Sequence, residues 1–248
     1  MVYLGQNAGA YSGSVDDGQA AAEFHWTRYK RALVARYLSA LPSKDKVVDI
    51  GCRDGINAAF FRTACGVAEM HGVDIADAPL AQARARGIST ARWISGEAPF
   101  PAESGAFDAV IAMDVIEHIY DTEEFVRELA RVTREGGTLL VTTPNLAWWR
   151  NRLRLLIGKM PAGAPGVSVN VARDRGIDLK HLRLGVAAEW MHLFETVGLT
   201  VNATAGYTFD VLTGAQRTLD HWITRWPTLA HSILYVLKKP AASRTPHR

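Results

Sequence analysis

The chain has 248 residues, of which 48% are hydrophobic and 21% charged, a composition typical of one globular domain. Its formal net charge of +3 comes from the end of the chain, since the four basic residues of 238–248 leave 24 basic and 25 acidic residues elsewhere. Because the chain before residue 238 is nearly neutral, a broad nucleic-acid-binding surface is not expected. Two cysteines, Cys52 and Cys65, exclude a disulfide framework and a cysteine-rich metal site.

The first residues, MVYLGQNAGAYSGS, lack the basic and apolar regions of a secretion signal. No apolar run approaches the roughly 20 residues that a membrane-spanning helix needs. We therefore expect a cytoplasmic protein without a transmembrane segment.

Residues 1–17 are small and polar, and we expect them to be flexible. In 19–41 the pattern becomes helical, with large side chains at steps of three and four at Trp26, Tyr29, Leu33, Tyr37 and Leu41. The pattern predicts a helix that packs on the core, with basic residues around the rest of its surface. Its aromatic residues also suit a lid over a ligand cleft.

The next hundred residues alternate strand and helix patterns, which predicts an α/β fold with a mostly parallel, doubly wound sheet. Asp121 and Glu124 carry the signature of a helix start, and the helix is expected to run to residue 134, before Gly136 and Gly137. A helix is also expected at 79–86. The predicted strands are 46–50, 70–75, 91–97, 107–113 and 138–144.

The alternation of strand and helix patterns stops at 146–198, which we interpret as a cap inserted after the fifth strand. Two more strands are expected at 199–207 and 231–237, and residues 241–248 are expected to be disordered. The whole chain is then one domain, with the N-terminal helix and cofactor-binding core in 18–145 and the final strands in 199–240.

The loop after the first strand, DIGCRDG at 49–55, lies where open parallel sheets bind ligands. Gly51 lets a ligand approach the backbone, but a dinucleotide fingerprint would need further glycines where Arg53 and Ile56 stand. NAD is therefore not expected. Asp74, at the end of the second strand, suits a ribose diol, and Glu97 suits an adenine amino group. Ribose and adenine acceptors without a phosphate loop favour S-adenosylmethionine.

The segments VVDIGCRDG, HGVDI, FDAVIAMDVIEHI and GGTLLVTTPN, in this order, resemble the class I S-adenosylmethionine-dependent methyltransferases over residues 40–240. The resemblance implies a seven-stranded sheet with an antiparallel last strand and an S-adenosylmethionine site. It places Asp49, Gly51 and Gly55 around the methionine moiety, Asp74 on the ribose, Ile75 against adenine, Glu97 and Ala98 at the adenine edge, and Met113 on the methionine side.

Two positions depart from the pattern of this family. Arg53 stands where a glycine is common, and we expect it to contact the cofactor carboxylate. Glu97 replaces the commoner aspartate, which adds a methylene group and keeps the charge.

Methyl transfer requires alignment of donor and acceptor and the removal of one proton. His118 and His181 are the candidate catalytic residues, although His118 also suits a structural role beneath the next helix. Together with Asp114 and Glu117 they resemble the metal site of small-RNA 2′-O-methyltransferases and ubiquinone-pathway O-methyltransferases. Two carboxylates and two imidazoles would suit Mg²⁺ or Mn²⁺. We expect transfer without a tightly held metal.

The stretch 146–161, LAWWRNRLRLLIGKMP, places Trp149, Leu153 and Leu156 on one helical face, and Arg150 and Arg154 on another. We expect the apolar face to pack on the sheet. The alternative is an interfacial or lid helix with weak contact to a membrane surface. This stretch, with KHLRL at 180–184, is similar to quinone, sugar and natural-product methyltransferases and to methyltransferase-like proteins of methionine biosynthesis, which implies that His181 and Arg183 lie near the acceptor.

These observations favour methylation of an oxygen atom on a small-molecule acceptor. Two alternatives stay open: a methyltransferase-like regulatory protein that binds a partner, and a metal-assisted RNA 2′-O-methyltransferase. The nearly neutral body and the lack of an RNA-binding module disfavour the latter.

Overall fold

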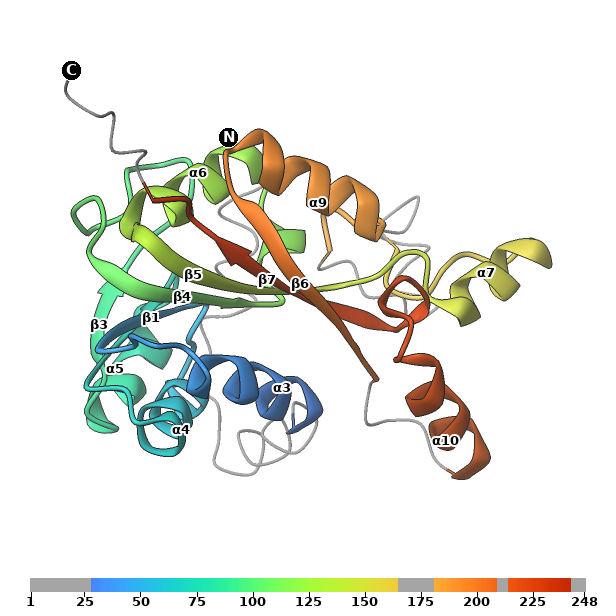
Figure 1. Ribbon diagram of the computed structural model, residues 1–248, viewed down its shortest axis with the longest axis horizontal. Coiled ribbons are helices and arrows are strands. Elements are labelled where there is room, and N and C mark those ends of the chain that lie inside the picture. Colours follow the sequence, from blue (N-terminus) through green and yellow to red (C-terminus); the bar gives the residue numbers. More distant parts are fainter. Residues whose placement is uncertain (1–27, 165–180, 209–213, 242–248) are drawn as a thin grey trace, which may run out of the picture.

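The computed structural model describes residues 28–164, 181–208 and 214–241. They form an α/β domain around one seven-stranded sheet with the order β3-β2-β1-β4-β5-β7-β6 (Figure 1). β7 is antiparallel to both of its neighbours, and the pairs from β3 to β5 are parallel. The sequence-based prediction of this sheet is confirmed. The strands are β1 Lys46–Ile50, β2 Glu69–Asp74, β3 Ser89–Arg92, β4 Phe107–Met113, β5 Thr133–Pro144, β6 Thr200–Tyr207 and β7 Ser232–Lys238.

Helices cover both faces of the sheet (Figure 1). One face carries α3 (Arg28–Ser39), α4 (Ile56–Cys65) and α5 (Asp77–Ala85), and the other carries α6 (Thr122–Val132) and α9 (Ala187–Thr196). Because successive side chains of a strand point to opposite faces, each central strand contributes to two separate cores. The apolar runs of β1, β4 and β7 follow from this double burial.

α3 packs on the sheet as expected, but with a face that differs from the predicted one. Val34 and Leu38 are fully buried, whereas Leu33 and Tyr37 are only partly buried. Arg31, one of the basic residues expected around the rest of the helix surface, is buried, and its guanidinium lies 5.1 Å from the ring centre of Phe60. The predicted start of this helix, including Trp26, lies outside the described residues.

Two strand boundaries differ from the prediction. β3 ends at Arg92, because the chain then turns and the indole N–H of Trp93 donates to the carbonyl of Ala98. β5 begins at Thr133, where α6 has already ended, and the register with β4 shifts between Phe107 and Ala109. The predicted helix start is confirmed, since the Asp121 carboxylate accepts from the Glu124 N–H at 3.0 Å.

The cap region contains α7 (Trp149–Leu156), which projects from one end of the molecule, and α10 (Gly214–Ile223) lies at the same end (Figure 1). The prediction that the apolar face of α7 packs on the sheet is wrong: the exposed fractions of Leu153 and Leu156 are 52% and 82%. Within the described ranges, no helix is both long and apolar enough to cross a bilayer. Residues 1–17, which we expected to be flexible, lie outside those ranges, and so do 242–248 of the segment 241–248 that we expected to be disordered.

Candidate active site

The candidate site lies at the carboxyl ends of the central strands. β1 pairs with β2 on one side and with β4 on the other, so the chain connections diverge at the ends of these strands. Such a switch point is where open α/β sheets bind ligands. Asp49, Asp74 and Met113 lie at or next to the last position of these three strands, and Asp114 follows β4 directly.

The loop between β1 and α4 contains three residues in the left-handed region. Gly51, Arg53 and Gly55 have φ values of +73°, +49° and +75°. A Cβ atom at Gly51 would lie 2.6 Å from a methyl group of Val115, so this turn requires glycine. Arg53, where the resemblance described above expects a glycine, adopts the left-handed conformation that favours glycine. The loop therefore keeps its close approach to the strand ends despite this substitution.

Asp74 joins this loop to β2. Its buried carboxylate accepts hydrogen bonds from the backbone N–H of Arg53 at 2.9 Å and of Ala76 at 3.1 Å. Each carboxylate oxygen can accept more than one hydrogen bond. The carboxylate of Asp74 can therefore accept hydrogen bonds from the two hydroxyl groups of a ribose in addition to those from the backbone.

Asp49 is almost completely buried within β1, with an exposed fraction of 1%. Burial raises the pKa of its carboxyl to about 8, and the nearby Asp74 adds to the rise while Lys30 opposes it. An unpaired carboxylate is costly in such an environment, so the group retains a proton near neutral pH. A cationic ligand group close to Asp49 would favour the ionised form.

The residues expected on the adenine side lie at the ends of β2 and β3. Ile75 is half-buried, and its carbonyl accepts from the Arg92 guanidinium at 3.0 Å. Glu97 and Ala98 are exposed in the turn after β3. Met113, expected on the methionine side, is half-buried and packs against the core beneath α3 and α4. Contacts of these four residues with a cofactor stay a prediction.

The structure places Asp114 in a network that the sequence did not predict. Its carboxylate lies 2.6 Å from the Lys30 ammonium and accepts from the hydroxyl groups of Thr142 at 2.7 Å and Tyr207 at 3.1 Å. Burial would raise the pKa of Asp114, but these three donors hold it below its ordinary value. Asp114 has a φ of +55°, a conformation that aspartate tolerates better than most residues.

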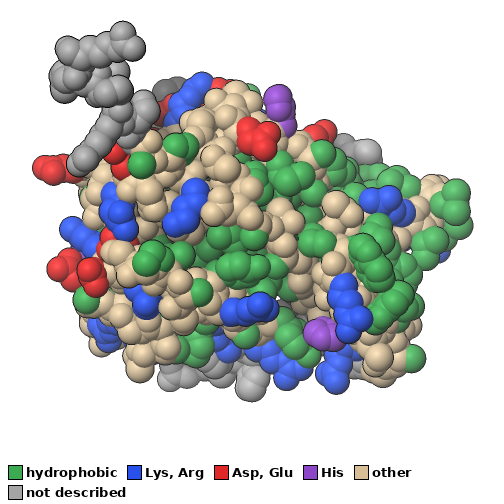
Figure 2. Space-filling view, in the orientation of Figure 1, with side chains coloured by type: hydrophobic (Ala, Val, Ile, Leu, Met, Phe, Trp, Pro, Cys, Tyr) green, Lys and Arg blue, Asp and Glu red, His purple; other side chains and the backbone are tan. Residues whose placement is uncertain are grey.

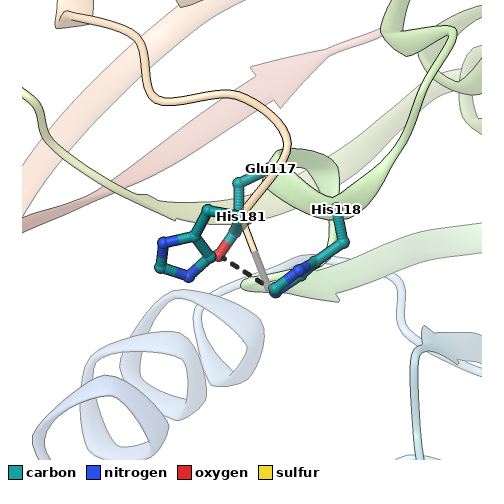
Figure 3. A group of neighbouring side chains, drawn as sticks. All are labelled: Glu117, His118 and His181. Carbon is teal, nitrogen blue, oxygen red and sulfur yellow. Dashed lines mark ion pairs between the residues drawn. The ribbon is translucent and has the colours of Figure 1, made fainter. Parts of the chain in front are cut away.

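Glu117, His118 and His181 form a second group beside this network (Figure 3). Their candidate ligand atoms all lie within 4.8 Å of one another. Glu117 and His118 belong to the short 3₁₀ helix η1 (Ile116–His118), and His181 comes from the cap region. The carbonyl of Glu117 accepts from the N–H groups of Leu182 and Arg183, which fixes the second histidine beside η1.

Asp114 is absent from this group, so the four residues that resemble a metal site are divided between two clusters. The described structure gives the carboxylate oxygens of Glu117 no hydrogen-bond partner, although the side chain is completely buried. Burial, followed by the charge of Asp114, raises the pKa of Glu117 well above its ordinary value. Burial therefore favours the protonated, neutral form of Glu117, and a cation bound beside it would favour the ionised form.

The two imidazoles have defined surroundings. Their ring centres lie 5.0 Å apart, and Nε2 of His118 lies 3.9 Å from Oε1 of Glu117. Nδ1 of His181 lies 2.9 Å from the carbonyl oxygen of Gly163, to which it donates in the matching tautomer. This tautomer leaves the Nε2 lone pair of His181 available to accept a proton or to ligate a cation.

Comparison with known proteins places the chain among methyltransferases. A family model described as a methyltransferase domain matches residues 23–204. The chain is 29% identical over 186 residues to a protein of Mycolicibacterium smegmatis named as a probable S-adenosylmethionine-dependent methyltransferase, covering 75% of this chain. It is 29% identical over 173 residues to the ubiquinone biosynthesis O-methyltransferase of Pseudomonas aeruginosa, covering 68% of this chain and 70% of the relative.

The chain spans 63% of the length of the M. smegmatis relative and 44% of a Mycobacterium tuberculosis relative of the same description. Among solved structures, the geranyl diphosphate C-methyltransferase of Streptomyces coelicolor matches with a TM-score of 0.64 and 14% identity. This match covers 96% of the present chain and 99% of the other. At that identity the likeness concerns the fold.

Proposed function

Since the chain belongs to the class I S-adenosylmethionine-dependent methyltransferases, we propose that it transfers the methyl group of this cofactor to an oxygen atom of a small-molecule acceptor. The observation that carries the proposal is the juxtaposition, at one edge of the sheet, of the Gly51 loop and Asp74 with the His118–His181 pair.

The chemistry of the loop and strand ends fits the cofactor. Bound S-adenosylmethionine supplies a methyl group on a positively charged sulfur. Asp74 offers acceptors for a ribose, and the tight turn at Gly51 keeps the backbone open at the strand end. Asp49 offers a carboxyl whose ionised form a cationic group would stabilise. Arg53 adds a guanidinium at the same loop.

An oxygen acceptor is supported by the names of the relatives, which include the O-methyltransferase of P. aeruginosa. A hydroxyl group must lose its proton as the new bond forms, and imidazole nitrogens are common proton acceptors in enzymes. His181, oriented by the Gly163 carbonyl, and His118 beside it are the residues that we assign to this role.

Cation-assisted transfer is a second candidate, favoured by one observation. Both oxygens of Glu117 are buried without a hydrogen-bond partner in the described structure, an arrangement that a bound cation would compensate. Glu117, His118 and His181 would then hold a divalent cation, and the Gly163 carbonyl would orient one ligand. The cation would lower the pKa of an acceptor hydroxyl.

Calorimetry with S-adenosylhomocysteine, followed by transfer of a labelled methyl group to a panel of phenols, alcohols, amines and carbon acids, tests the proposed function. We expect micromolar binding of S-adenosylhomocysteine, no heat with NAD, and label on an oxygen. Binding of NAD without binding of S-adenosylhomocysteine would overturn the cofactor assignment. Label on nitrogen or carbon alone would overturn the choice of acceptor atom.

A further inference from the structure

Large exposed hydrophobic side chains gather at one end of the described structure. Of the nine that it contains, only Tyr120 lies elsewhere. The other eight lie on α7 and the turn after it, or on α10 and the turn after it, and we call them the α7–α10 surface. They are Leu153, Leu155, Leu156, Ile157, Met160, Leu219, Trp222 and Trp226. An apolar patch of this kind marks an interaction site more often than scattered exposed residues do.

The exposed side chains of α7 stand on a defined structure. The buried Asn151 accepts from the N–H of Ala162 at 2.8 Å and donates to its carbonyl at 3.3 Å. The guanidinium of Arg154 donates to the carbonyl of Met160 at 2.7 Å. These bonds fold 157–162 back along α7, so the apolar side chains of both segments are presented outward together.

α10 is fixed to the base of α7 by one buried carboxylate. The indole N–H groups of Trp148 and Trp149 donate to the same oxygen of Asp220, at 2.9 and 2.8 Å, and the hydroxyl of Thr208 donates to the other oxygen. Both helices are therefore held at the same end of the molecule (Figure 1). The ring centres of Trp222, on α10, and Trp226, in the turn after it, lie 4.9 Å apart.

Among the described residues of α7, α10 and the turns after them, the exposed charges have one sign. Between residues 146 and 164 the sequence contains arginine and lysine but no acidic residue. Between 214 and 226 the only acid is Asp220, which is 1% exposed and occupied by the two indoles. Figure 2 shows blue side chains among the green ones at this end. The exposed charged residues of the two stretches are Arg152, Arg154, Lys159, Arg217 and Arg225.

We propose that the α7–α10 surface docks on the face of an anionic lipid bilayer. Leucine, isoleucine and tryptophan side chains surrounded by basic residues match the acyl boundary and the negative headgroups of such a membrane. A protein partner would have to supply a complementary acidic rim, whereas the anionic bilayer supplies its charge at every position.

The docked surface adjoins the candidate active site. Gly163, at the end of the segment that folds back along α7, carries the carbonyl that orients His181. A bilayer at this surface would bring amphiphilic acceptors to the histidines. This second step rests on the proposed function, whereas the docking does not, so the two can fail separately.

Flotation with vesicles of phosphatidylcholine, with and without phosphatidylglycerol, tests the docking. We expect the chain to bind the phosphatidylglycerol vesicles on the order of tenfold more tightly, and added salt to weaken the binding. Leu155→Asp/Leu156→Asp should lower binding at least about tenfold, since it places charges in the acyl boundary. Lys159→Glu/Arg217→Glu should remove the preference for the anionic lipid.

Ala81→Asp/Ala85→Asp is the matched control, because it adds two acids to exposed positions of α5, on the other part of the sheet. It should bind vesicles as the unmodified chain does. Binding of S-adenosylhomocysteine verifies that each variant is folded. Equal flotation of all variants, or none by the unmodified chain, overturns the proposal. A dimer that Leu155→Asp/Leu156→Asp dissociates, without vesicle binding, would assign the surface to a second copy instead.

Discussion

The ammonium group of Lys30 lies 2.6 Å from the carboxylate of Asp114, although 84 positions separate the two residues in the chain. The pair joins α3 to the end of β4, at the edge of the sheet where the candidate site lies. α3 therefore covers the core through Val34 and Leu38 and reaches the site through Lys30.

Replacing Lys30 with methionine should destabilise the protein by about 1–2 kcal/mol at pH 7, because a partly buried carboxylate loses its cation. The folded pKa of Asp114 lies below its unfolded value, so the stabilisation is present at neutral pH and is lost as the pH falls. The difference between the two proteins should narrow only below about pH 4. Urea unfolding at several pH values measures it.

Arg36→Met is the control for this prediction, since Arg36 is an exposed cation on the same helix. It should change the free energy of unfolding by less than about 0.5 kcal/mol. Equal losses in the two variants would mean that the Lys30–Asp114 pair does not stabilise the fold.

Asp74→Ala should weaken S-adenosylhomocysteine binding by roughly 1–3 kcal/mol, the cost of leaving buried hydrogen-bonding groups unpaired. The N–H groups of Arg53 and Ala76 also lose their acceptor, so we expect a lower melting temperature in a protein that still folds. Calorimetry and thermal denaturation separate the two effects. Unchanged affinity in the folded variant would mean that the ribose binds elsewhere.

Asp49→Asn should make stability less dependent on pH. The folded state raises the Asp49 pKa from 3.8 to about 8, so it retains a proton that the unfolded chain releases between these values. The free energy of unfolding of the unmodified chain therefore falls as the pH rises across this window. Relative to the unmodified chain, the ligand-free variant should gain at least about 1 kcal/mol between pH 5 and pH 8.

The same denaturation series on Asp45→Asn provides the comparison, because Asp45 is exposed just before β1. Its stability should follow that of the unmodified chain at every pH. Parallel curves for the unmodified chain and Asp49→Asn would show that Asp49 ionises freely in the fold.

The central sheet could be predicted from sequence because burial on both faces leaves an unbroken apolar run, as in FDAVIAM at 107–113. β3 was misplaced because an edge strand is buried less: STAR at 89–92 has no apolar pattern, and the conspicuous Trp93 belongs to the turn beyond it. The face of α3 was misplaced because Arg31 packs on an aromatic ring, which a hydrophobic periodicity does not anticipate.

The position of a site residue could be predicted where it follows from the end of a strand, as for Asp74, and not where it depends on contacts between distant segments. Neither the Lys30–Asp114 pair nor the bond between Trp148 and Asp220 has a local pattern. For the same reason, the sequence did not predict that Asp114 and Glu117 belong to two different clusters. Their close spacing in the chain suggested one cluster. The left-handed conformation of Asp114 turns its carboxylate toward α3 instead.

The last prediction separates proton transfer from cation binding at His118 and His181. If the two histidines act as general bases, replacing either one with alanine should lower turnover roughly 10²–10⁴-fold, with or without a chelator. His192→Ala, which removes an exposed imidazole from α9, should leave turnover unchanged. If the histidines instead hold a cation, EDTA should abolish turnover of the unmodified chain, and Mg²⁺ or Mn²⁺ should restore it.

Glu117→Gln provides the sharper test, because the raised pKa of Glu117 favours the neutral carboxyl when no cation is bound. An amide of similar shape then replaces a protonated acid, so without a metal the variant should keep its stability and most of its turnover. A cation needs the ionised carboxylate, and in that case the variant should lose both turnover and metal-dependent stabilisation. We expect the metal-free outcome. Loss of turnover in a well-folded Glu117→Gln protein, together with full rescue of the EDTA-treated unmodified chain by Mg²⁺ or Mn²⁺, would establish the cation-assisted mechanism instead.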